Sequence, residues 1–268
     1  MRWWCTSSQG VAWTWTWQPY IGVWAFIILI AVAYWWQSRS LDRVDNKRIA
    51  FFAAGLISLW LALDWPIGPL GAGYLASVHM VQYMLIALIA PPFLLLGTPA
   101  AGFAKLNDHP RILGTLRNTT QPLIAFFIFN VLITVTHWPS LVDPLMRTQF
   151  GSFVLDISWL LIGLIFWWPL ISPVPAWPRF VPMFKLAYLG LNGIIIRPPF
   201  FILLFSKYPA YATYELAPPI AGTSALSDQQ LAAGIMKLGS ALIMMIAMVF
   251  VFFQWVKASK EKAAATSP

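Results

Sequence analysis

The chain has 268 residues, of which 59% are hydrophobic and only 10% are charged, and its mean hydropathy is +0.70. A soluble domain carries roughly a quarter charged residues, so this composition excludes a water-soluble globular protein. The net charge of +8 does not indicate nucleic-acid binding, because basic residues of membrane proteins collect in cytoplasmic loops. The single cysteine, Cys5, excludes an internal disulfide, and we expect it to be an incidental thiol in a poorly ordered tail.

Apolar stretches long enough to cross a bilayer, which takes about 20 residues, recur along the chain. Proline, glycine and charged residues separate them, and we expect no cleavable signal peptide at the start. The predicted spans are residues 20–37, 49–64, 73–96, 121–137, 153–171, 183–205 and 231–255. The sequence therefore predicts an all-α polytopic transmembrane bundle of about seven spans over residues 20–256, with an N-terminal extracytoplasmic segment at 1–19 and a basic cytoplasmic tail at 257–268.

Lysine and arginine are distributed unevenly between the two sides of the predicted bundle. One side carries Arg39, Arg43, Lys47, Arg48, Lys105, Arg111, Arg117, Arg179, Lys257, Lys260 and Lys262. The other side carries only Arg2, Arg147 and Lys207. Because basic loops stay inside, the C-terminus is predicted to be cytoplasmic and the N-terminus outside.

Several ionisable or polar residues fall within these spans, where they are costly and usually face the bundle interior. His79 lies about two turns into the third span and shares a helix face with Gln82 and Tyr83. The predicted topology places six such residues in the outer half of the membrane: His79, His137, Asp156, Arg197, Asp228 and Lys237. This convergence predicts that function lies at the outer face.

Most of these residues also have a structural explanation. Asp228 is placed to be the N-cap of its own helix, and the position of His137 at the end of a span is also that of an interfacial histidine. A structural ion pair of Asp156 with Arg197 or Lys237 is favoured over catalysis.

The chemistry that these residues support best is metal binding. Imidazole suits copper and zinc, and a carboxylate added to imidazole suits Cu(II) or zinc. His79 and His137 with an aspartate therefore predict a modest metal site. The sequence contains no nucleophile elbow, no zinc-protease motif and no phosphate loop, so we expect no enzymatic activity.

Six stretches, in their order and spacing, resemble the CtaG-type cytochrome c oxidase assembly factors, a family implicated in delivering copper to haem–copper oxidases. The stretches are DWPIGPL (64–70), SVHMVQ (77–82), APPFLLLG (90–97), THWP (136–139), FWWPL (166–170) and SDQQLAAGIM (227–236). The resemblance extends from about Trp60 to Lys237 and implies that His79, His137 and Asp228 are what remains of the family's ligands. Family members typically carry a further histidine where this chain has Tyr83, and histidines near the start of the fifth span, where this chain has only Asp156.

Two functions follow from the resemblance. In the first, the chain is a bacterial inner-membrane assembly factor that contacts oxidase subunits and presents copper at the outer face, using His79 and His137 with Met80 or Met84. In the second, it has lost metal binding and is a structural subunit of a larger respiratory or photosynthetic complex. A transporter or channel is a weaker third interpretation, because no paired repeats are evident.

Overall fold

The fold is that of a computed structural model that describes residues 2–7, 10–39, 41, 44–100, 103, 109–171, 174, 177, 180–195, 197–220 and 222–266. The described residues form helices joined by short connections, with no strand among them. The basic residues Arg43, Lys105 and Arg179 lie outside the described part. The helices are α1 Ile21–Ser38, α2 Asn46–Leu63, α3 Ile67–Gly73, α4 Ala76–Tyr83, η1 Met84–Ile89, α5 Ala90–Gly97, α6 Pro110–Thr119, α7 Pro122–Val135, α8 Pro139–Met146, α9 Gln149–Ile171, α10 Pro182–Ile194, α11 Pro198–Phe205, α12 Ala212–Glu215, α13 Ala225–Gly234, η3 Ile235–Gly239 and α14 Ser240–Thr266.

The predicted all-α transmembrane bundle is confirmed. Within the described residues, six helices are long and apolar enough to cross a membrane. A seventh span is obtained if α6 and α7, which meet at an angle of 76°, are counted together. The bend lies just before Pro122, the first residue of α7, where a missing backbone N–H is tolerated at a helix start but not within a helix.

The sixth predicted span, residues 183–205, is not one continuous helix. It is divided into α10 and α11, and the first two residues of α11 are Pro198 and Pro199. Because proline cannot donate the backbone hydrogen bond that a helix interior needs, the chain ends one helix and begins another here. Arg197 occupies the N-cap position of α11 and is thereby placed in the interruption.

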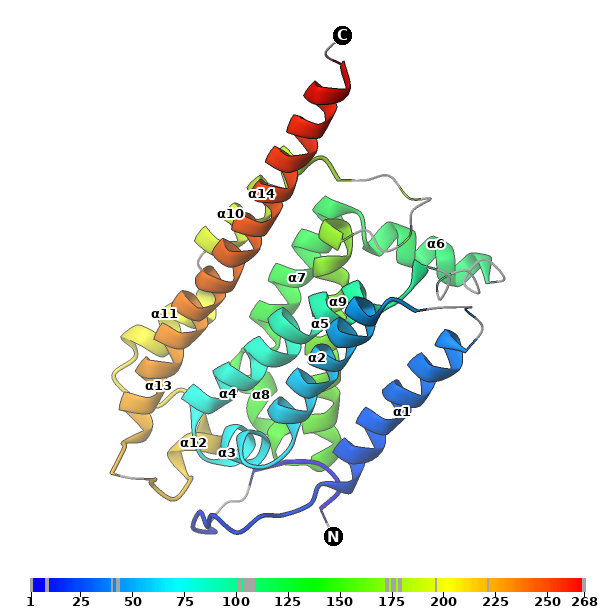
Figure 1. The fold of residues 1–268 in the computed structure, drawn as a ribbon. Helices are drawn as coiled ribbons and strands as arrows, with labels where there is room; N and C mark the ends of the chain where they lie inside the picture. The colour runs from blue at the N-terminus through cyan, green and yellow to red at the C-terminus, as the bar shows by residue number, and fades with distance from the viewer. Residues whose placement is uncertain are drawn as a thin grey trace.

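The core is built around α4, η1, α5 and α9, and α1 lies at the edge of the bundle (Figure 1). In α9 most side chains between Gly151 and Leu170 are buried, whereas in α1 only Val23 is. Gly163 permits the close approach of α9 to η1, because a Cβ there would lie 2.3 Å from the Ala87 carbonyl oxygen. The π-helical turns η1 and η3 meet in the same way, with Met84 packed on Gly239.

The N-terminal segment packs on the bundle, which corrects the expectation of a poorly ordered tail around Cys5. Trp4 and Cys5 are both buried, and the Cys5 thiol donates a hydrogen bond to the Leu63 carbonyl oxygen at 3.1 Å. Burial raises the pKa of this thiol well above its usual value, and the nearby carboxylates of Asp156 and Asp64 act in the same direction. Cys5 is therefore a packed, unreactive side chain.

The two ends of the bundle differ in what covers them (Figure 1). The N-terminal segment, α3 and α12 lie at one end, which we call the N-terminal end. The C-terminal part of α14 extends past the other helices at the opposite end. The N-terminal segment reaches Asp156, one of the residues singled out in the sequence, because the Trp4 indole donates to its carboxylate.

Candidate functional site

Two histidines from distant parts of the chain pack on the same tryptophan. The ring centroid of Trp159 in α9 lies 4.9 Å from that of His79 in α4 and 5.3 Å from that of His137, two residues beyond α7. Tyr83 completes the group, at 4.9 Å from His137 and 5.4 Å from Trp159. We call these four side chains the Trp159 cluster, and all four are buried.

A chain of hydrogen bonds holds the His79 ring. Its Nδ1 lies 3.3 Å from Oε1 of Gln82, and the Gln82 amide nitrogen donates to Oδ1 of Asp156 at 3.4 Å. The second Asp156 oxygen accepts from the Trp4 indole N–H at 2.8 Å. Because the amide oxygen can only accept, Nδ1 of a neutral His79 carries the proton and Nε2 carries the lone pair.

A backbone carbonyl holds the His137 ring in the same tautomer. Its Nδ1 lies 2.8 Å from the Ile133 carbonyl oxygen, so Nδ1 is the donor and Nε2 again carries the lone pair. The neighbouring backbone is also fixed. The Tyr211 hydroxyl donates to the His137 carbonyl oxygen at 2.6 Å, and the Trp159 indole donates to Thr136 Oγ1 at 3.1 Å.

The Nε2 atoms of both histidines are buried and have no hydrogen-bond partner. Buried polar atoms without a partner are uncommon and need an explanation. A metal-binding imidazole has this arrangement, with one nitrogen donating to an oxygen and the other left as the ligand. The two rings are therefore pre-oriented to offer lone pairs inside the bundle, and they fit copper in the chemistry of their donors.

Asp228 has a role other than capping its own helix, where the capping side chain is Ser224. The Asp228 carboxylate accepts hydrogen bonds from the backbone N–H and the hydroxyl of Ser77, in the first turn of α4. A carboxylate at a helix N-terminus satisfies an unpaired N–H and interacts favourably with the helix dipole. Asp228 thus fixes the start of the helix that carries His79.

The two predicted thioether donors occupy different surroundings. Met80 is fully buried in the hydrophobic core, next to His79 in the chain. The Met84 sulfur lies against Gly239 of η3, where a Cβ would approach it to 2.5 Å. Met84 accordingly packs η1 onto η3.

The predicted ion pair of Asp156 with Arg197 or Lys237 does not form. The Arg197 guanidinium donates instead to Oδ1 of Asn130 at 3.1 Å and to Oδ1 of Asn192 at 2.9 Å. It also lies 5.4 Å from the Phe129 ring centroid. Side-chain amide oxygens and an aromatic face therefore replace a carboxylate around this buried charge.

Lys237 is also removed from Asp156. Its ammonium donates to the carbonyl oxygens of Gly193, Ile194 and Ile195 at 2.8, 2.8 and 3.2 Å. These are the carbonyls left unpaired where α10 ends before the interruption, and a cation at a helix C-terminus is favourable. Both cations thus stabilise the broken sixth span.

The described residues contain no group of three or more His, Cys, Asp or Glu side chains placed to hold one metal ion. The arrangement offers two imidazoles, with Tyr83 alongside. Trp4, Trp159 and Tyr211 were not among the predicted site residues, because the prediction followed the ionisable residues of the spans. The third histidine, His109, is exposed at the N-cap position of α6.

Together, the fold and this buried cluster define a polytopic helical membrane protein with a histidine pair inside its bundle. The family model described as cytochrome c oxidase caa3 assembly factor matches residues 23–258. The chain belongs to that family, which confirms the resemblance seen in the sequence.

Curated relatives share about a quarter of their aligned residues with this chain. An uncharacterized protein of Mycobacterium bovis is 23% identical over 280 residues, which cover 85% of this chain and 40% of that protein. An uncharacterized protein of Mycobacterium leprae is 24% identical over 279 residues, which cover 91% of this chain and 40% of that protein. The chain thus spans about two-fifths of the length of the curated relatives it matches. No solved structure matches the chain.

Proposed function

We propose that this protein assists the assembly of a haem–copper cytochrome c oxidase and that His79 and His137 bind copper as cargo. The observation that carries the copper step is that His79 and His137 both pack on Trp159 and that the buried Nε2 atom of each has no hydrogen-bond partner. Family membership supports the assembly role.

The small number of ligands suits cargo that must be released. Copper has a high affinity for imidazole nitrogen, and two imidazoles leave its coordination incomplete, so an acceptor protein can supply further ligands and withdraw the ion. Asp156 acts through Gln82 to hold the His79 ring in the ligating tautomer, and the loss of a hydrogen bond that orients a ligand typically lowers metal affinity by about 10–100-fold.

The proposal places the histidine pair in the outer half of a bacterial inner membrane, with the N-terminus outside, because basic residues gather after the first and third spans and beyond the last. Its partners are the oxidase subunits and the surrounding lipid. The protein acts by binding and release and has no catalytic activity of its own.

Cu(I) titration of the purified full chain against a chromophoric Cu(I) chelator tests the proposal. The expected result is one Cu(I) per chain in the wild type and at least a tenfold loss of affinity in His79→Ala and in His137→Ala. His109→Ala is the matched control, because it removes the remaining histidine, which is exposed and outside the cluster, and it should leave the affinity unchanged. A wild type that does not bind Cu(I), or an equal loss in the control, would contradict the copper role.

A second function, as a structural subunit of a larger respiratory or photosynthetic complex, is favoured by one observation. Asp156, Asp228 and Met84 are all engaged in internal contacts, so among the predicted ligands in the described part of the chain only His79, His137 and Met80 are left for a metal. Under this alternative, the protein co-purifies with one large complex in constant ratio and contains no copper.

A further inference from the structure

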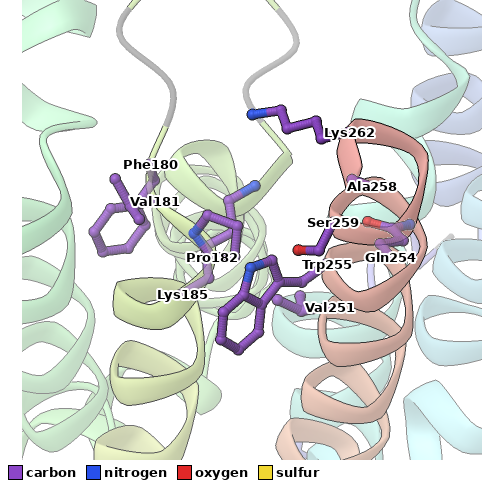
Figure 2. Close-up of a pocket in the computed structure, with 10 residues that line it drawn as sticks. All are labelled: Phe180, Val181, Pro182, Lys185, Val251, Gln254, Trp255, Ala258, Ser259 and Lys262. Atoms are coloured by element: carbon purple, nitrogen blue, oxygen red, sulfur yellow. The ribbon is translucent and has the colours of Figure 1, made fainter. Parts of the chain in front are cut away.

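A groove of about 550 Å³ opens between the start of α10 and the last turns of α14. Figure 2 shows Phe180 and Pro182 on one side and Trp255, Ser259 and Lys262 on the other. The α14 residues that line the groove recur every three or four positions, so they form one face of that helix. None of the residues that line the groove belongs to the Trp159 cluster, and Figure 1 shows that α14 extends past the other helices toward its C-terminus.

The groove lies where α14 changes from apolar to charged. Phe250, Phe252 and Phe253 are exposed apolar side chains of its membrane segment, and the charged residues begin at Lys257. Trp255 lies between them, at the depth where indole is favoured because it is apolar with one hydrogen-bond donor. The groove therefore opens at the boundary between the hydrocarbon and the lipid headgroups.

The rim of the groove is positively charged. Lys185 reaches it from α10 and Lys262 from α14, and the ten described residues that line it include no aspartate or glutamate. The Lys185 ammonium also donates to the Leu170 carbonyl oxygen at the end of α9, which holds its charge in place. Gln254 and Ser259 add hydrogen-bonding side chains.

We propose that this groove binds an anionic phospholipid. Its phosphate faces Lys185 and Lys262, and its acyl chains lie along the apolar part of α14, where Val251 and Trp255 line the groove and Phe250 is exposed. Basic pockets between transmembrane helices bind lipid headgroups through this combination of cationic rim and apolar wall. A charged rim above a lipid-exposed wall suits a lipid better than an acidic protein segment, which would leave the wall uncovered.

Native mass spectrometry of the full chain, titrated with phosphatidylglycerol or phosphatidylcholine, tests this proposal. Each lysine near the surface strengthens the binding of an anionic lipid by about fivefold, so we expect the two groove lysines to make phosphatidylglycerol bind the wild type about 25-fold more tightly than phosphatidylcholine. The double variant Lys185→Gln/Lys262→Gln should lose this preference. The matched control Lys257→Gln/Lys260→Gln removes the same charge from α14 outside the groove and should retain the preference within about twofold.

Because Lys185 also caps α9, its substitution could change the stability of the fold as well as lipid binding. The single variant Lys262→Gln therefore tests the groove separately, with Lys260→Gln as its control. Lys262 is on the exposed end of α14, and its loss should reduce the preference by about fivefold without lowering the melting temperature. An equal preference for the two lipids in the wild type would overturn the proposal. Equal losses in the groove and control variants would also overturn it, because they would indicate attraction to net charge alone.

Discussion

The two ends of the bundle differ in where their charged groups lie. At the N-terminal end, Asp156 and Asp228 are buried and each accepts hydrogen bonds from protein donors far away in the chain. At the other end, Lys185 and Lys262 border an open groove. A buried charge has to be organised by the fold before any ligand arrives, whereas a charge at the rim of a groove also faces the lipid. Substitutions at the N-terminal end should therefore change stability and metal affinity together, and substitution of Lys262 should change mainly lipid binding.

The largest effect is expected from Trp159→Ala. Trp159 is fully buried and contacts both histidines and Tyr83. Its loss should lower the free energy of unfolding by about 3–5 kcal/mol, measured by denaturant titration in detergent. Trp36→Ala is the control, because Trp36 is 70% exposed on α1, and it should change the free energy by less than about 0.5 kcal/mol. Similar losses in both variants would contradict the difference between cluster and periphery.

The second effect concerns Gly71 in α3. A Cβ at Gly71 would lie 2.7 Å from Oε1 of Gln82 and 3.1 Å from the His79 backbone. Gly71→Ala should displace the amide that fixes the His79 tautomer and reduce Cu(I) affinity by about 10–100-fold. Gly114→Ala, where a Cβ would meet nothing within 4 Å, should leave Cu(I) affinity unchanged. Retained affinity in Gly71→Ala would show that the Gln82 contact does not position His79.

The smallest effect is expected from the loss of a helix cap, and two caps can be compared. Asp228 caps α4 in a buried position, and Ser224 caps α13 in an exposed one. Asp228→Ala should lower the free energy of unfolding by about 1–2 kcal/mol and Ser224→Ala by about 0.5 kcal/mol. Because Asp228 supports α4 without ligating copper in this proposal, its variant should weaken Cu(I) binding less than His79→Ala does. A loss of copper binding equal to that of His79→Ala would make Asp228 a ligand, as the sequence first indicated.

The family and the all-α transmembrane fold could both be predicted from the sequence. Hydropathy over about 20 residues is a local property, because a helix in lipid must satisfy its own backbone and present apolar side chains wherever it meets lipid. Proline positions are local too, and Pro198-Pro199 could have indicated the interruption of the sixth span.

Only the tertiary structure decided which polar side chains meet. Asp156 accepts a hydrogen bond from Trp4, 152 positions away in the sequence, and Asp228 accepts one from Ser77, 151 positions away. Asp156 does not form the predicted ion pair, and Asp228 does not cap its own helix. A buried charged group takes whichever hydrogen-bond partners the packing of other helices brings to it, and Arg197 and Lys237 donate to amide and carbonyl oxygens in place of carboxylates. The sequence by itself determined that two histidines lie inside a membrane bundle. Packing around Trp159 decided that their free nitrogens are buried, oriented and left without a partner.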